Sequence, residues 1–234
     1  MVYNKGCIRI GLTFLISLWG FLFYYGEILK AQGDEVEQKI AQLNSPEKTL
    51  RKDAANQLGF LKDPRGVDPL IQVLEKDPDS DVRRNAANAL GALGDKRAVQ
   101  PLIQALTDKS KDVCREAALA LGKLNDPQAV EPLIKTLKNS DHFIRLAAVT
   151  SLGRLKDERA IEPLIGMLSD KDPFIREKAA LALGEFGDER ALDSLDRLVQ
   201  NDPEKSVRQV AGKALEKIKK RVPSPQLKKQ QTSP

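Results

Sequence analysis

Apolar residues recur along most of the chain at helical spacing, in two alternating patterns that are both visible between Asp81 and Leu106. The first half of this stretch places apolar residues three or four positions apart, at Val82, Ala86, Ala89, Leu90 and Leu93. The second half follows the same rule, at Val99, Leu102, Ile103 and Leu106. Such spacing puts each set on one face of a helix. The stretch therefore predicts a helical pair, here called an A helix followed by a B helix.

This pair is repeated along the chain with a nearly constant period. A glycine near the end of the A pattern recurs in steps of 31 or 32 residues, at Gly59, Gly91, Gly122, Gly153 and Gly184. A Pro-Leu-Ile sequence in the B pattern keeps the same period, starting at Pro69, Pro101, Pro132 and Pro163. Two independent markers with one period are typical of a solenoid, whose units must stack to bury their apolar faces.

Local sequence signals refine the expected helices. Alanine dominates the apolar positions of the A helices, which predicts close stacking of their backbones, and we expect these helices to end through glycine, as at Gly94. An aspartate before each B helix, such as Asp95, can accept hydrogen bonds from the first turn. Pro101 lies about five residues inside the expected B helix, so a kinked first turn is predicted there.

The repeated run D-x-V-R-x-x-A-A-x-A-L-G-x-L-x-D-x-R-A-V-x-P-L-I-x-x-L resembles the HEAT-like repeat of phycobilisome lyases and many bacterial scaffold proteins. The resemblance implies an all-α fold, a right-handed α-solenoid of stacked antiparallel helix pairs. It covers residues 34–221, with about five full repeats between capping half-repeats, the first of them a lone B-type helix at residues 34–44. Proteins of this kind include binding modules, bilin-attaching enzymes and a metal oxygenase, so the resemblance favours a fold more strongly than a function.

The two ends of the chain differ from the repeats. Residues 10–29 contain a charge-free apolar run and are predicted to be a transmembrane anchor or a signal segment, preceded by a cytoplasmic N-terminus at residues 1–9. Cleavage near Gly33 is the alternative to a retained anchor. Either way the repeats are expected on the non-cytoplasmic side, as a single-pass membrane protein or a secreted one. Residues 222–234 are expected to be a disordered basic tail.

The net charge of +5 is a property of these ends. Residues 1–33 contribute +2 and residues 217–234 contribute +6, which leaves −3 for the repeats. A nucleic-acid-binding array is therefore not indicated.

Few residues in the chain could carry catalysis. One histidine and two cysteines cannot form a metal cluster with ligand spacing, so we expect no catalytic residues, metal or cofactor. The HEAT-repeat deoxyhypusine hydroxylases hold iron with His-Glu pairs, whereas His142 is followed by Phe143. Cys114 stands where the other units have an arginine, and it is either a packing residue or a reactive thiol. That recurrent arginine and the aspartate before the B helix are expected to pair and set the register between repeats.

Two sets of residues are candidates for binding a partner. The first is a polar strip along the B helices, on the face expected to be concave by resemblance to HEAT proteins, formed by Asp68 and Gln72, Gln100 and Gln104, Glu131 and Lys135, Glu162 and Gly166, and Asp193 and Arg197. The second is Phe143 and Phe174, which hold the same place in adjacent units and are expected to be neighbours. The strip is either a binding face or a solvated surface, and the phenylalanines are either interface anchors or staples packed on the preceding helix.

These observations favour a membrane-anchored HEAT-repeat scaffold without catalysis, which binds a protein or peptide partner on its concave helix surface. The resemblance implies an alternative, a bilin lyase or chaperone-like protein that acts on phycobiliproteins. The sequence indicates no oligomeric state.

Overall fold

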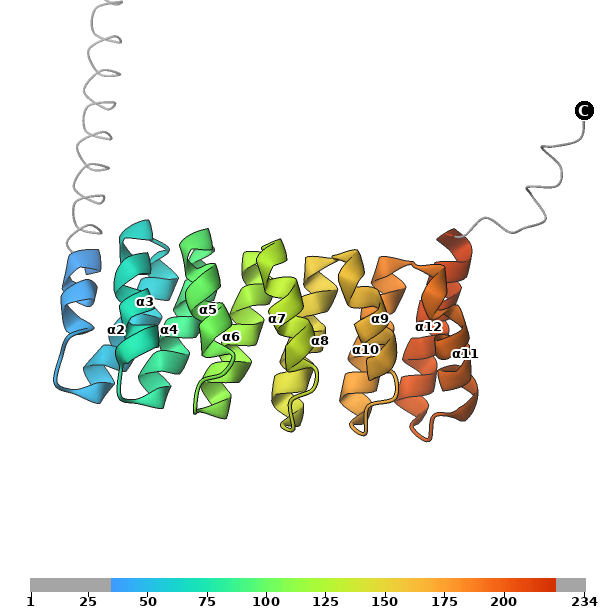
Figure 1. Cartoon of the computed structure of the whole chain (residues 1–234). Coiled ribbons are helices and arrows are strands. Elements are labelled where there is room, and N and C mark those ends of the chain that lie inside the picture. The colour runs from blue at the N-terminus through green and yellow to red at the C-terminus, as the bar shows by residue number, and fades with distance from the viewer. Residues whose placement is uncertain (1–34, 222–234) are drawn as a thin grey trace, which may run out of the picture.

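The computed structural model of the chain describes residues 35–221, which form helices and short turns without any strand. The A helices are α2 (Lys48–Leu61), α4 (Ser80–Leu93), α6 (Lys111–Leu124), α8 (His142–Leu155), α10 (Pro173–Phe186) and α12 (Lys205–Arg221). The B helices are residues 35–42, α3 (Val67–Lys76), α5 (Val99–Ala105), α7 (Val130–Thr136), α9 (Ile161–Met167) and α11 (Leu192–Asn201). Figure 1 shows these twelve helices side by side in one elongated array. The all-α repeat fold is confirmed.

The helices are arranged in two layers with one continuous apolar core. Each A helix packs along the next A helix, and each B helix packs against the A helix that follows it in the chain. Successive B helices, in contrast, touch each other little. The A layer is therefore the closely packed side of the array, and the B layer leaves space between its helices.

Glycine explains the close packing of the A layer. The recurrent glycines lie inside the A helices, two residues before the last one, and face a small residue of the next A helix: Ala89, Ala120, Ser151, Ala182 or Ala214. A Cβ atom at Gly91 would lie 2.8 Å from the Cβ of Ala120. The glycines thus permit contact between backbones. The helices end later, at a left-handed residue that is Gly94 or Gly187 in two units and Lys62, Asn125 or Lys156 in the others.

The B helices begin later than the sequence predicts. A short 3₁₀ turn precedes each of them, at Pro64–Gly66, Lys96–Ala98, Pro127–Ala129, Glu158–Ala160 and Glu189–Ala191. Pro101 is consequently the third residue of α5, where an amide would have no acceptor within the helix. The proline therefore costs no hydrogen bond of the helix, and the first turn, which was predicted to be kinked, is a 3₁₀ turn.

The helices at both ends of the described range contribute apolar residues to the core. In the first B helix Val36 is buried, Leu43 is buried just after it, and Ile40 packs on the core. At the other end, α12 buries Val207, Ala211 and Ile218 and ends in exposed basic residues. Their positive charge interacts favourably with the negative C-terminal end of the helix dipole.

The predicted membrane localisation is corrected. Within residues 35–221, none of the helices combines the length and the apolar character needed to cross a bilayer. The segment on which the prediction depended, residues 10–29, lies outside the described residues, as do residues 1–9, the cleavage site near Gly33 and residues 222–234. A single-pass membrane protein is therefore not supported.

Candidate functional site

The polar strip on the B helices borders a row of hollows. Five hollows lie between successive B helices, with volumes from about 210 to about 530 Å³. The second strip residue of each unit lines one of them, in chain order Gln72, Gln104, Lys135, Gly166 and Arg197. The hollows exist because the B helices are short and loosely spaced. They repeat once per unit along one face of the array.

The first strip residue of each unit has a different role. Asp68 accepts from Arg97 of the next unit at 2.8 Å, and the Gln100 amide donates to Gln128 at 2.8 Å. Glu131 and Glu162 approach Arg159 and Arg190 at 3.8 Å in the same way. All these side chains are about half exposed or more, so each contact contributes at most about 1 kcal/mol. The strip residues thus separate into one row that links units and one row that faces the hollows.

The recurrent arginine is buried at the other end of the helices. The Nε atom of Arg145 donates to Asp170 at 2.8 Å, and its terminal nitrogens donate to Asp170 and to the carbonyls of Asn139 and Ser140. The same arrangement joins Arg51 to Asp77, Arg83 to Asp108 and Arg176 to Asp202. Each arginine ties the loop before its A helix to the loop after the next B helix. The register role is supported, but the partner is not the aspartate before the B helix.

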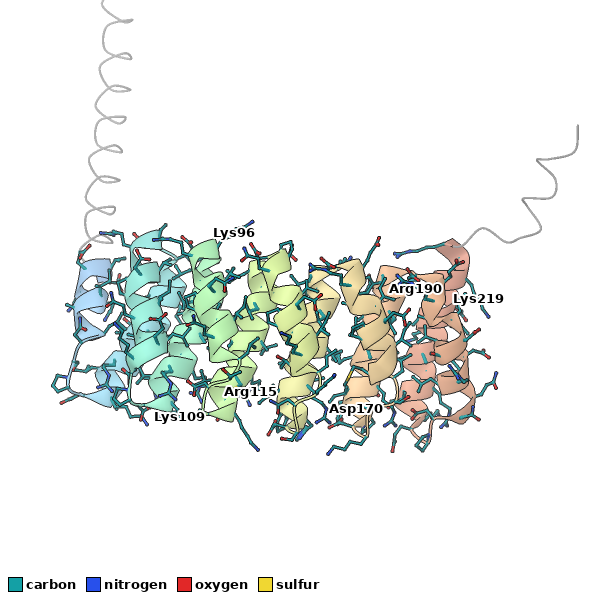
Figure 2. The ribbon with its side chains drawn as sticks, in the orientation of Figure 1. Lys96, Lys109, Arg115, Asp170, Arg190 and Lys219 are labelled. Carbon is teal, nitrogen blue, oxygen red and sulfur yellow. The ribbon has the colours of Figure 1, made fainter. Side chains whose placement is uncertain are left out.

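That aspartate has its own arginine two residues further on. Asp157 accepts from the backbone amide of Arg159 at 3.0 Å and from the Arg159 side chain at 2.8 Å. Hydrogen bonding to Arg159 lowers the pKa of Asp157 to about 2. Asp63, Asp95 and Asp188 repeat this geometry, so the predicted capping is confirmed. Figure 2 shows Arg190, from one such pair, and Asp170, from the buried series, at opposite ends of the helices.

The buried arginine series is interrupted once, by Cys114. Its thiol donates to the carbonyl of Asp108 at 3.0 Å, a position that an arginine nitrogen takes in the other units, and burial raises the pKa of the thiol. At the position where the other units have the paired aspartate, this unit has Asn139. The side-chain oxygen of Asn139 accepts a hydrogen bond from the backbone amide of Asp141 at 2.9 Å. Cys114 is only 4% exposed, which favours the packing interpretation. Asn139 was not among the residues predicted from the sequence, although it follows Cys114 by 25 residues, the same separation as between Arg83 and Asp108.

The two phenylalanines belong to the A layer, at the starts of α8 and α10. Phe143 is 52% exposed and Phe174 is 67% exposed, so much of each ring is open to solvent, and their role as anchors or staples stays a prediction. The Phe143 ring lies over the neighbouring His142, with ring centroids 3.9 Å apart. The predicted partner-binding residues are therefore divided between two layers, and the phenylalanines do not line the hollows.

In the part of the chain that the structure describes, no three His, Cys, Asp or Glu side chains are grouped so that they could hold a metal ion. His142 lies at the start of α8, directly after its cap, Asp141. The described residues that place polar side chains beside a row of hollows are those of the B layer.

Stacked helix pairs with a constant period define an α-solenoid repeat protein. The family model for HEAT repeats matches residues 36–121, 100–168 and 144–216, and the chain belongs to this family. The HEAT-like resemblance expected from the sequence is confirmed. A comparison with curated proteins gives no match.

Solved structures share the fold. An engineered protein is 24% identical, with a TM-score of 0.60, over 80% of this chain and 97% of that one. A designed armadillo repeat protein in complex with the peptide (KR)4 is 22% identical, with a TM-score of 0.60, over 79% and 99% of the two chains. The complex of CpcE and CpcF of phycocyanin lyase from Nostoc sp. PCC7120 is 26% identical, with a TM-score of 0.45, over 82% and 91%.

Proposed function

We propose that this protein is a non-enzymatic scaffold that binds an extended peptide segment of a partner protein along its B-helix face. The observation that carries the proposal is the row of five hollows, one between each two successive B helices. The right-handed sense of the solenoid and a concave curvature of this face are part of the proposal.

The spacing of the hollows suits an extended chain. Packed helices lie about 8–10 Å apart, and an extended peptide advances about 3.3–3.6 Å per residue. A new hollow is therefore met about every second or third residue of such a peptide. The partner would present these residues to the array, with the intervening residues in solvent.

The residues around the hollows offer suitable contacts. Gln72 and Gln104 are exposed beside two of the hollows, and an amide side chain both donates and accepts hydrogen bonds. Amides can thus bind the backbone of a peptide whatever its sequence. The designed armadillo repeat protein that was solved with (KR)4 illustrates that a related helical array accommodates a peptide.

The bilin-lyase alternative and the two phenylalanines of the A layer are separate from this proposal. No observation within residues 35–221 favours the bilin-lyase alternative over peptide binding. That Phe143 and Phe174 form a second contact area for a partner, on the A layer, stays a prediction. Both rings are exposed to solvent, so a partner could contact them.

Selection from a random dodecapeptide library on the full chain tests the proposal, followed by fluorescence polarisation with the enriched peptides. The variant Gln104→Trp places a bulky side chain in the hollow between α3 and α5, and should weaken binding at least about tenfold. Its matched control is Gln209→Trp, an exposed position on α12 in the A layer, which should leave binding unchanged. Peptide binding weaker than about 1 mM, or equal effects of both variants, would refute the proposal.

A further inference from the structure

The five hollows are not equivalent in charge. Four of them include at least one aspartate: Asp77, Asp108, Asp170 or Asp202. The fifth, between α5 and α7, has a volume of about 420 Å³ and no acidic residue in its lining. Asn139 lines this hollow at the position where the other hollows have their aspartate. One hollow in the middle of the row therefore lacks the carboxylate that the others share.

The interruption of the arginine series explains this difference. At the other loops the aspartate is held by a buried arginine: Arg51, Arg83, Arg145 or Arg176. Cys114 cannot neutralise a carboxylate, and an unpaired buried charge is unfavourable. Asn139 keeps the loop hydrogen bond to the amide of Asp141 while it removes the negative charge. The loop geometry is preserved, and the carboxylate is absent from this hollow.

The lining of this hollow is largely apolar. Ile103 of α5, Leu106 and Pro132 form much of its wall, together with the methyl-bearing side chains of Thr107 and Thr136. An apolar surface of this kind gains free energy when it is covered by another apolar group, at about 25 cal/mol per Å². The hollow therefore suits an apolar side chain.

Two lysines stand at the rim. Lys135 and Lys138 both line the hollow and are exposed. Neither forms a salt bridge with any residue between 35 and 221. Glu131 lies one turn before Lys135 on α7 and approaches Arg159 at 3.8 Å. The rim thus carries two positive charges beside a lining without an aspartate or glutamate, and these charges would complement a carboxylate on the partner.

We infer that the hollow between α5 and α7 is the anchor position for the bound peptide, and that it takes an apolar side chain next to an aspartate or glutamate. The inference rests on the proposed function, because it names the peptide class that this face recognises. A basic peptide is disfavoured here, since its charge would face Lys135 and Lys138 at a hollow whose lining contains no carboxylate. Burial of the apolar side chain supplies affinity, and the lysines supply selectivity.

The test is the same random dodecapeptide selection, carried out in parallel on wild type, Lys135→Glu and Arg197→Glu. The last variant is the matched control, because it makes the same charge change on the same strip, at the hollow between α9 and α11. Wild type should enrich peptides in which an apolar residue lies within two positions of an acid. Lys135→Glu should bind those peptides about fivefold to tenfold more weakly and enrich apolar residues beside lysine or arginine. Arg197→Glu should retain the wild-type preference around the apolar residue.

A second measurement separates the anchor from the charges. In an enriched peptide, replacing the apolar residue by serine should weaken binding at least about tenfold, which corresponds to about 1.4 kcal/mol. Replacing the acid should weaken it less and reduce its dependence on salt.

The possible failures are distinct. If the chain binds peptides without this preference, or if Lys135→Glu and Arg197→Glu have the same effect, the anchor inference is overturned and peptide binding on this face stands. If the chain enriches no peptide, the proposed function fails and the anchor inference fails with it.

Discussion

Gly91 of α4 lies so close to Ala120 of α6 that a Cβ atom at Gly91 would approach the Cα of Ala120 to 2.9 Å. The same contact joins each A helix to the next, with Ser151 in place of alanine at one junction. This repeated close approach makes the A layer a continuous support from which the B helices project. The hollows of the B face depend on it, because the A layer fixes the spacing of the units.

Gly91→Ala is therefore expected to destabilise the array. The new methyl group meets backbone and Cβ atoms that cannot move without shifting α6, which costs about 1–3 kcal/mol. Gly166→Ala in α9 is the control, since a Cβ there meets nothing within 4 Å, and helix propensity predicts a gain of about 0.5–1 kcal/mol. Urea unfolding followed by circular dichroism measures both variants. Equal midpoints for the two would contradict the packing role of Gly91.

Cys114 and Asn139 are expected to be coupled. Cys114→Arg introduces a buried cation without its carboxylate, and Asn139→Asp introduces a carboxylate without its cation, so each change alone should lower the stability. The double variant recreates the arrangement of Arg83 and Asp108 and should be more stable than the sum of the single effects by about 1–3 kcal/mol. A double-mutant cycle from urea unfolding gives the coupling. Additive effects would show that the two positions do not form a pair.

The stability of the array should fall on acidification below about pH 4. Hydrogen bonding to Arg159 lowers the pKa of Asp157 to about 2 in the folded chain, whereas an unfolded aspartate titrates near 3.9. A lowered folded pKa stabilises the fold above the unfolded pKa, and this contribution is lost as the pH falls from about 4 to about 2. Urea midpoints at pH 7, 4, 3 and 2.5 should follow this decline.

The variant Asp157→Asn isolates that contribution. Asparagine still caps the 3₁₀ turn but carries no charge. The variant should be less stable than wild type at pH 7, and the difference should shrink towards pH 2.5. If the difference in stability between the variant and wild type stays constant over this pH range, the loss does not come from the charge of Asp157.

Phe143 and Phe174 should contribute little to stability. Both rings are more than half exposed, so the double change to serine is expected to alter the free energy of unfolding by no more than about 0.5 kcal/mol. Differential scanning calorimetry can measure this directly, with Ile144→Ser, which removes a buried side chain one residue away, as the destabilised reference. A large loss in the phenylalanine variant would favour the staple interpretation.

The class of fold could be predicted from the amino-acid sequence alone. The period of 31 or 32 residues and the two helical patterns predict the number of units, the identity of the A and B helices and the buried apolar face, because these depend on local spacing within one unit. The aspartate caps followed from the sequence for the same reason. The ends of the helices were less predictable, since Lys62, Asn125 and Lys156 adopt the left-handed conformation as Gly94 does.

Which residues act together depends on the packing of one unit against the next. The partner of Arg145 is Asp170, 25 residues away across a B helix, and not the aspartate of the cap, because the stacking of units brings that loop to the guanidinium. The division of the strip into linking residues and hollow-lining residues also arises between units. Periodicity describes a single unit, whereas burial, charge compensation and the absence of a carboxylate from the hollow at Asn139 depend on how one unit is placed against the next.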